Sequence, residues 1–377
     1  MTLDDPALDT LMLPFEQNLL PWPQDGDTLF LRAREGAALH RRPRAGLVCE
    51  QSFKPDAEAL QRAGLALVEP GDDHRYPLVL LLPPRQREEA RALYARAVAS
   101  AAPGGRVVAC LANNEGARSG EDDLRKLAGP VGSLTKHKCR VFWTAPLHRP
   151  DSAANIDAAL LAQWQALDAP RSIADGRFSS RPGVFAWNRI DPASALLAAQ
   201  LPADLGGRAA DLGAGFGYLS VELLQRCPGI AALDLYEAEG RALELARRNL
   251  APFESQAVLG FHWHDVTAGL PERYDVIVSN PPFHTQGRAD RPDIGRRFIA
   301  VAAEALKPGG RLWLVANRHL PYEEVLTASF GSVRTVAQQD GFKIIEAVKA
   351  RPAQPVRAPK PFNKADLRRL SRRDPQQ

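Results

Sequence analysis

The chain has 377 residues, of which 45% are hydrophobic and 24% are charged. This is the composition of a globular protein, and the length suits two domains. No apolar run approaches the roughly 20 residues needed to span a membrane, and the acidic N-terminus lacks the pattern of a secretion signal. The four cysteines are far apart in sequence and form no Cys-x-x-Cys pair. We therefore expect no disulfide framework, no zinc site and a cytoplasmic location.

Basic residues concentrate at the C-terminal end of the chain. Residues 350–377 contain eight Lys or Arg and two acidic residues, a net charge of +6, whereas the whole chain has a net charge of only +4. This distribution predicts a basic arm that contacts the phosphates of a nucleic acid. A solvated tail without a specific partner is the alternative.

One ordered pattern occurs twice. In the first half, an apolar strand ends at Pro83-Pro84, and a helix, a Pro103-Gly-Gly turn and a second apolar strand follow. The second half repeats this order with Asn280-Pro-Pro and Lys307-Pro-Gly-Gly, and a hairpin-like segment closes each copy. We infer two related α/β domains that arose by duplication, with chance similarity as the alternative. The predicted divisions are 1–146 for a first domain, 147–176 for a linker with a helix, 177–350 for a second domain, and 351–377 for the basic tail.

The second half alternates strands and helices. Its apolar segments predict strands at 208–212, 231–236, 275–279 and 311–316, and helices at 217–226, 240–249 and 295–306. Such alternation indicates a mostly parallel, doubly wound sheet. Two further strands joined at Asp340-Gly341 predict a terminal antiparallel hairpin. This combination is typical of class I methyltransferases with a Rossmann-like fold, whereas ordinary dinucleotide-binding domains lack the hairpin.

A glycine-rich turn follows the first strand of the second half, with glycines at 213, 215 and 217. Such turns let backbone N–H groups approach a ligand, but they also serve NAD, FAD and nucleotides. Asp211 at the strand end favours S-adenosylmethionine, because a carboxylate can bind the methionine ammonium. Glu237, at the end of the next strand, can accept both ribose hydroxyl protons. Asp234 is the rival for this role, but it lies inside the strand.

The third loop offers a further carboxylate. Asp265 can accept a hydrogen bond from the adenine amino group, although it could instead only cap a turn. His262 and His264 alternate along one strand like a pair of metal ligands. Without a third ligand nearby, we expect no metal.

The tetrapeptide Asn280-Pro281-Pro282-Phe283 ends a strand of the second half. An aromatic amine is a poor nucleophile, because its lone pair is delocalised into the ring. The side-chain oxygen of Asn280 and a proline carbonyl can accept its two N–H bonds and stabilise the positive charge that develops. Phe283 can stack on the base. A structural turn is the alternative to this catalytic loop.

A paired base hides its amino group, so the target base must be unpaired or flipped out of the helix. Four arginines near the predicted loop can hold the nucleic-acid backbone, or they can simply solvate a helix face: Arg288, Arg291, Arg296 and Arg297.

Several segments resemble the bacterial ribosomal RNA guanine-N2 methyltransferases, which consist of two tandem methyltransferase-like domains with a degenerate first copy. They are Asn280-Pro-Pro-Phe-His284, Leu314-Val-Ala-Asn-Arg-His-Leu-Pro-Tyr322, Phe330-Gly-Ser and Gly341-Phe-Lys-Ile. The similarity extends from Pro182 to about Lys349, and more loosely over the first half through Asn114-Glu-Gly-Ala-Arg-Ser119 and Thr135-Lys-His-Lys-Cys-Arg140. The first half favours the small-subunit (16S) type, whereas Asn317-Arg-His-Leu also resembles the large-subunit (23S) type. The basic tail departs from the pattern.

The resemblance implies S-adenosylmethionine at Asp211, Gly213, Glu237 and Asp265, and a base contact at Asn280. It implies methylation of the exocyclic N2 of a guanine in 16S ribosomal RNA by a monomer that acts on ribosomal RNA or a ribosomal subunit, without metal or membrane. The alternatives are a guanine of 23S RNA, adenine N6, a protein glutamine, or a non-enzymatic RNA-binding assembly factor.

The first half has Leu82 where the second has Asn280, and it lacks the Gly-x-Gly-x-Gly turn. We therefore expect the first domain to bind no cofactor, to cover the active domain and to help hold RNA. Its candidate RNA contacts are Lys136, His137, Lys138 and Arg140.

Overall fold

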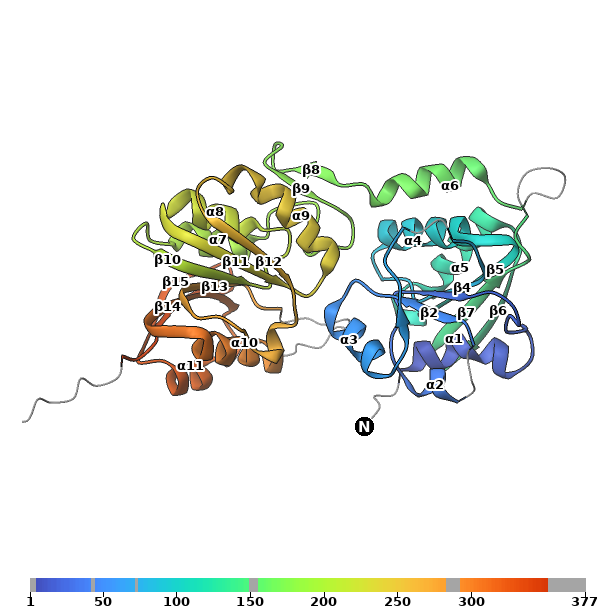
Figure 1. The fold of residues 1–377 in the computed structure, drawn as a ribbon, viewed down its shortest axis with the longest axis horizontal. Coiled ribbons are helices and arrows are strands. Elements are labelled where there is room, and N and C mark those ends of the chain that lie inside the picture. Colours follow the sequence, from blue (N-terminus) through green and yellow to red (C-terminus); the bar gives the residue numbers. More distant parts are fainter. Residues whose placement is uncertain (1–4, 42–44, 72–73, 149–154, 283–291, 352–377) are drawn as a thin grey trace, which may run out of the picture.

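The computed structural model describes residues 5–41, 45–71, 74–148, 155–282 and 292–351 (Figure 1). It contains two seven-stranded sheets, with strand orders β3-β2-β1-β4-β5-β7-β6 and β12-β11-β10-β13-β14-β16-β15. Matched strand by strand, the two orders are identical. This confirms two tandem α/β domains of related topology, in which the final strand of each sheet in chain order is antiparallel to both of its neighbours and the other strand pairs are parallel.

The first unit is built as follows. Its strands are β1 (Thr28–Leu31), β2 (Leu47–Glu50), β3 (Ala66–Leu67), β4 (Tyr76–Leu81), β5 (Ala101–Ala112), β6 (Val131–Lys136) and β7 (Cys139–Thr144). Its helices are α1 (Pro6–Glu16), α2 (Ala37–His40), α3 (Lys54–Arg62), α4 (Arg87–Ser100), the 3-10 turn η1 (Asn113–Glu115) and α5 (Ala117–Ala128).

Four elements connect the two sheets: α6 (Ala158–Gln165), the 3-10 turn η2 (Ala166–Asp168), and the paired strands β8 (Arg171–Ile173) and β9 (Phe178–Ser180). A helix thus lies within residues 147–176, and its Trp164 is buried in the core of the first unit. The β8–β9 hairpin spans the boundary expected at residue 177.

The second unit repeats the plan. Its strands are β10 (Gly206–Leu212), β11 (Gly229–Glu237), β12 (Val258–Trp263), β13 (Tyr274–Ser279), β14 (Leu306–Asn317), β15 (Ser332–Gln339) and β16 (Phe342–Val348). Its helices are α7 (Pro192–Gln200), α8 (Tyr218–Arg226), α9 (Gly240–Leu250), α10 (Pro292–Ala305) and α11 (Glu323–Ser329), with 3-10 turns η3 (Ala251–Phe253) and η4 (Val266–Ala268).

Each sheet lies between two helical layers. In the second unit α7, α8 and α9 cover one face, and α10 and α11 cover the other. In the first unit α4, α5 and α6 pack on one face, and α1, α2 and α3 on the other. The sheets are therefore buried on both faces, as their apolar strands predict. Within the described residues no helix is long and apolar enough to cross a membrane.

The topology of the second sheet determines where a ligand can bind. From β10 the chain proceeds outward to β11 and β12, then returns to the other side of β10 and continues through β13 and β14. The strand order thus reverses between β10 and β13, which are paired with Leu212 opposite Ser279. Ligands of such sheets bind beyond the carboxyl ends of the strands at this reversal. Asp211 and Asn280 lie at these ends.

The two units contact each other beside the second unit's β11 (Figure 1). Phe53, just before α3, forms an isolated β-bridge with Glu239, and Gly240 N donates to Ser52 O at 2.8 Å. The indole nitrogen of Trp263 donates to the same Ser52 carbonyl at 2.8 Å. This contact lies two residues beyond Glu237, so the first unit supports the loop of a predicted cofactor residue.

A buried ionic cluster forms the second contact between the units. Glu89, at the start of α4 and 7% exposed, accepts from Arg32 at 3.0 Å and from Arg241 of α9 at 2.5 Å. Arg241 also donates to Asp168 and to the Pro182 carbonyl. Gly183 lies against the Glu89 carboxylate, where an added Cβ would come within 2.2 Å of it, and its φ is +92°. Only glycine fits this position.

We expect Glu89→Ala to lower the free energy of unfolding by about 3 kcal/mol, because two half-buried guanidinium groups would lose their shared buried carboxylate. Urea denaturation would measure the change. Asp122→Ala is the matched control, since it removes an exposed i,i+3 ion pair with Arg125 of the same domain and should change stability by less than about 0.5 kcal/mol. Equal effects of the two variants would contradict a stabilising role for the cluster.

Candidate active site

The glycine-rich turn joins β10 to α8. Gly213, Gly215 and Gly217 all have positive φ, at 75°, 56° and 88°. At Gly217, an added Cβ would lie 2.6 Å from a methyl carbon of Leu250, so the turn is packed tightly against α9. At Gly215 it would meet nothing within 4 Å. The backbone at Gly215 therefore borders open space, as a ligand-binding turn requires.

Asp211 is completely buried at the end of β10. Its Oδ2 accepts a hydrogen bond from the Ser220 hydroxyl at 2.8 Å, and its Oδ1 is buried without a partner among the described residues. Burial raises the pKa of this carboxyl to about 7, and the nearby charge of Glu237 adds to the shift. A buried acceptor without a donor is costly unless a ligand supplies one. The site thus fits a cationic group.

Glu237 ends β11 next to the turn. Its Oε2 accepts from Gly215 N at 2.7 Å, and its Oε1 accepts from Glu239 N at 2.8 Å. Burial raises its pKa, against the effect of these backbone hydrogen bonds. Both oxygens are thereby fixed in position, and each has a further lone pair with which to accept from a ligand hydroxyl.

Asp234, the rival candidate, is occupied elsewhere. Although burial opposes its ionisation, hydrogen bonds from His262, Arg208 and Tyr274 hold the pKa of its carboxyl below the usual value. The Arg208 guanidinium lies 2.8 Å from Oδ2 and the His262 ring nitrogen lies 3.0 Å from Oδ1. The geometry therefore makes Asp234 a structural acceptor, whereas Glu237 borders the glycine-rich turn.

Asp265 caps the 3-10 turn η4, where its Oδ1 accepts from both the backbone N and the hydroxyl of Thr267. The capping alternative is thus present in the structure, while no described residue donates to Oδ2. His262 stacks on Tyr236, and His264 contacts the Gly269 carbonyl. No group of three potential metal ligands occurs within the described ranges.

Asn280 follows β13 and lies across from the glycine-rich turn. Its amide nitrogen donates to Asp191 Oδ2 at 3.0 Å and to Ser194 Oγ at 2.9 Å. Pro281 is buried and Pro282 is exposed. Phe283, Arg288 and Arg291 lie outside the described residues, as does the tail from 352 onward.

Of the predicted site residues, Gly213, Gly215 and Asn280 line one pocket, whereas Asp211, Gly217, Glu237 and Asp265 do not line it. It is lined by Phe185, Ala186, Asp191, Ser194, Gly213, Ala214, Gly215, Phe216, Tyr218, Leu219 and Asn280. Phe185 is 61% exposed, which is unusual for a large aromatic side chain and marks it as a candidate ligand contact. Phe185, Asp191 and Ser194 are site residues that the sequence patterns do not single out. The only sequence signal is the Asp191-Pro192 pair, which predicts the start of a helix.

The first unit differs at every matched position. Because Leu31 pairs with Leu81 as Leu212 pairs with Ser279, strand register can be used to compare the two sheets. It places Phe30 at the position of Asp211, Arg32 at that of Gly213, Gln51 at that of Glu237 and Leu82 at that of Asn280. A buried phenyl ring and an arginine thus replace an acid and a glycine.

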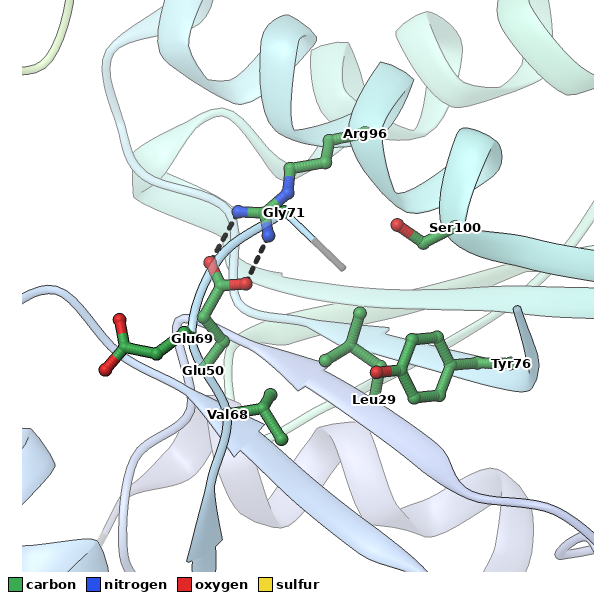
Figure 2. A pocket seen from close by; sticks show the side chains of 8 residues that line it. All are labelled: Leu29, Glu50, Val68, Glu69, Gly71, Tyr76, Arg96 and Ser100. Atoms are coloured by element: carbon green, nitrogen blue, oxygen red, sulfur yellow. Dashed lines mark hydrogen bonds and ion pairs between the residues drawn. The ribbon is translucent and has the colours of Figure 1, made fainter. Parts of the chain in front are cut away.

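A second pocket lies between α4 and the first sheet (Figure 2). Arg96 directs both terminal nitrogens at the two oxygens of Glu50, while Glu69 points away from them. The charges of Arg96 and Glu50 thus neutralise each other in this pocket.

The surface cations selected from the sequence are placed as follows. Lys136, His137 and Lys138 are exposed at the β6–β7 turn, and Arg140 is paired with Glu121. Arg296 donates to the Pro321 carbonyl, and Arg297 donates to the Thr267 carbonyl and to Glu304.

The fold and the pocket define a class of protein. Residues 175–346 match the family model described as the methyltransferase small domain, so the second unit is a methyltransferase domain. The chain belongs to the family of the ribosomal RNA small subunit methyltransferases C: it is 34% identical over 272 residues to the member from Pseudomonas aeruginosa, covering 71% of this chain and 78% of the relative. This confirms the resemblance noted in the sequence.

Two further comparisons agree with this placement. The ribosomal RNA large subunit methyltransferase G of Alcanivorax borkumensis is 38% identical over 170 residues, which cover 45% of this chain and 43% of that protein. A 16S rRNA N2 methyltransferase of T. thermophilus, solved in complex with AdoMet and guanosine, superposes with a TM-score of 0.74 at 24% identity. That match covers 92% of this chain and 93% of the other, and it shows the shared two-domain fold.

Proposed function

We propose that this chain transfers the methyl group of S-adenosylmethionine to the exocyclic N2 amine of a guanine in 16S ribosomal RNA. The observation that supports this most is the Asn280 amide, which lines the same pocket as the glycine-rich turn. Two relatives that match this chain over more than two thirds of their own length are named as small-subunit ribosomal RNA methyltransferases. A protein of the same fold was solved with AdoMet and guanosine.

The cofactor would be held at the carboxyl ends of β10, β11 and β12. Asp211 has an unpartnered buried oxygen for the methionine ammonium. Glu237 would accept from the ribose hydroxyls, and the backbone from Gly213 to Gly217 would border the ligand. Asp265 would accept from the adenine amine through the oxygen that its turn leaves available. The cofactor supplies a methyl group on a sulfonium, which needs no metal.

The acceptor chemistry rests on Asn280 and Pro281. The Asn280 side-chain oxygen and the Pro281 carbonyl accept the two N–H bonds of the guanine amine and direct its lone pair at the methyl carbon. As the new N–C bond forms, the C–S bond breaks and its electron pair stays on sulfur. The two oxygens stabilise the charge on nitrogen until a proton leaves to solvent. No strong base is required for this transfer.

Aromatic rings would fix the plane of the base. Phe185 lines the pocket with its ring exposed, and it is a stacking surface in addition to the predicted Phe283. The acceptor guanine must be unpaired to enter this pocket.

For the first domain we propose RNA contact without cofactor binding. The lack of a cofactor site is supported by the residues at the positions that match those of the second unit: Phe30, Arg32, Gln51 and Leu82. Lys136, His137 and Lys138 are exposed and available to phosphates, whereas Arg140 already has a carboxylate partner. The basic tail after Lys349 would add non-specific affinity for ribosomal RNA. This substrate implies action in the cytoplasm, by a monomer on the RNA or the small subunit.

A methyl-transfer assay tests the proposal. The purified protein is incubated with methyl-labelled S-adenosylmethionine and, separately, with 16S RNA, 23S RNA and small subunits that lack the modification. We expect label in 16S RNA or small subunits, released on digestion as N2-methylguanosine. Label in 23S RNA, in N6-methyladenosine or in protein glutamine would select the corresponding alternative. Absence of both transfer and cofactor binding by calorimetry would favour an assembly factor.

A further inference from the structure

We propose that Asp191 and Ser194, in the first turn of α7, are positioning residues that hold the Asn280 amide in its productive orientation and act on the reaction through it. The inference rests on the proposed function and names groups on a different element from the Asn-Pro-Pro loop. It begins from hydrogen bonds that span 89 and 86 positions of the chain.

Two hydrogen bonds fix the orientation of the Asn280 side-chain amide. The Asn280 amide nitrogen has two hydrogens, and Asp191 Oδ2 and Ser194 Oγ each accept one, at 3.0 and 2.9 Å. A flipped amide would turn its oxygen toward the Asp191 carboxylate, which cannot donate. The oxygen of Asn280 is therefore kept available as an acceptor, and the orientation is fixed before any substrate binds.

The N-terminus of α7 positions Asp191 and Ser194. Asp191 caps the helix, and its Oδ2 also accepts from Ser194 N at 2.9 Å. Pro192 at the first helical position fixes the backbone there. Ser194 is only 7% exposed. One carboxylate oxygen thus joins the cap of α7 to the amide at the end of β13, so the helix and the loop are held as one unit.

The negative charge of Asp191 affects the Asn280 amide. A hydrogen bond from an amide N–H to a carboxylate polarises the amide and increases the negative charge on its oxygen. During transfer, that oxygen faces an amine that is becoming cationic. Asp191 thereby stabilises the transition state more than the ground state, without touching the reacting nitrogen.

The experiment uses three variants of the full chain. Asp191→Asn keeps an oxygen that can cap α7 but removes the charge, Ser194→Ala removes the acceptor for the second amide hydrogen, and Gln200→Ala alters the far end of the same helix. We expect Asp191→Asn to lower kcat about 10- to 100-fold, because a hydrogen bond to a charged acceptor becomes a neutral one, and Ser194→Ala to lower it about 10-fold, because one hydrogen bond is lost. The cofactor Kd and the melting temperature should stay near those of the Gln200→Ala control.

A double-mutant cycle with Asn280→Ala completes the test. If Asp191 acts through Asn280, adding Asp191→Asn to Asn280→Ala should cost no further turnover. An additive loss would show that Asp191 acts directly on the substrate and would overturn the inference. An unchanged kcat in Asp191→Asn would also overturn the inference. So would a loss of cofactor affinity and melting temperature in parallel with kcat, because that result would mean that Asp191 only caps α7.

Failure of the proposed function has a different signature. Unchanged turnover in Asn280→Ala, or no transfer to guanine by the unaltered protein, would overturn the proposed function and this inference together. Normal dependence on Asn280 with no effect of Asp191 or Ser194 would overturn this inference alone.

Discussion

Replacing Asn280 by alanine should lower kcat by about 10²- to 10³-fold, because the reacting amine loses the preorganised acceptor that orients it and stabilises its developing charge. The cofactor should bind with nearly unchanged affinity, since the methionine and adenosine contacts assigned to Asp211, Glu237 and Asp265 remain in place. Single-turnover methylation of 16S RNA measures the first quantity and calorimetry with S-adenosylmethionine measures the second.

The control is Asn113→Ala, an exposed asparagine directly after β5 in the first domain. It should leave both quantities unchanged. Turnover within a few-fold of the unaltered protein for Asn280→Ala would remove this residue from the mechanism. A parallel loss of cofactor affinity would instead assign Asn280 to the cofactor.

Cofactor affinity should depend on pH through Asp211. Its carboxyl has a pKa of about 7 in the cofactor-free protein because it is buried, whereas the methionine ammonium requires the carboxylate. Binding should therefore weaken about tenfold for each pH unit below 7 and release a proton near pH 7. Calorimetry in buffers of different ionisation enthalpy measures both effects. Affinity that is constant between pH 5.5 and 7.5 would contradict this assignment.

Asp211→Asn separates the charge from the shape of this side chain. The variant keeps an acceptor for Ser220 but cannot ionise, so we expect cofactor affinity to fall about 10- to 100-fold and to lose its pH dependence. The matched control is Glu222→Gln. Glu222 lies on α8 and forms an exposed ion pair with Arg177, so the pH dependence of cofactor affinity should be retained in this variant.

The same residue affects stability. The folded pKa of Asp211 lies above the ordinary value of 3.8, so the unfolded chain releases this proton at a lower pH. The stability that the protonated group contributes is fully present below about pH 4 and is lost as pH rises to about 7. The cofactor-free protein should therefore become less stable across this window relative to Asp211→Asn. Bound cofactor should reduce the difference.

Most of the second sheet could be predicted because its central strands are short segments dominated by apolar residues. Segments 208–212, 231–236 and 275–279 form the centre of the sheet and are buried on both faces. Strand β12 was missing from the predicted alternation. It is an edge strand whose residues are only partly buried, so its sequence is not constrained to a clear apolar pattern. The second terminal hairpin was predicted from its Asp340-Gly341 turn, and the first from the repeated pattern; His137, Lys138, Asp340 and Gly341 all have positive φ at these turns.

Some residues of the candidate site could likewise be selected from the sequence, and others could not. Asp211, Glu237 and Asn280 could be selected because each follows a recognisable strand, and parallel strands bring their carboxyl ends to one edge. Phe185 could not, because an aromatic residue in a loop is usually buried and only its 61% exposure identifies it. The contact between Glu89 and Arg241 joins two units that the sequence treats as separate.

The tandem fold, the family and the chemical groups at the strand ends follow from local sequence patterns, because strand patterns, glycine turns and the Asn-Pro-Pro motif act over a few neighbouring residues. Which side chains orient these groups depends on packing between distant parts of the chain. Asp191 meets Asn280 across 89 positions, and no local pattern encodes that distance. The contact exists because α7 packs over β14 and β16, and this packing brings the helix N-terminus to the strand reversal.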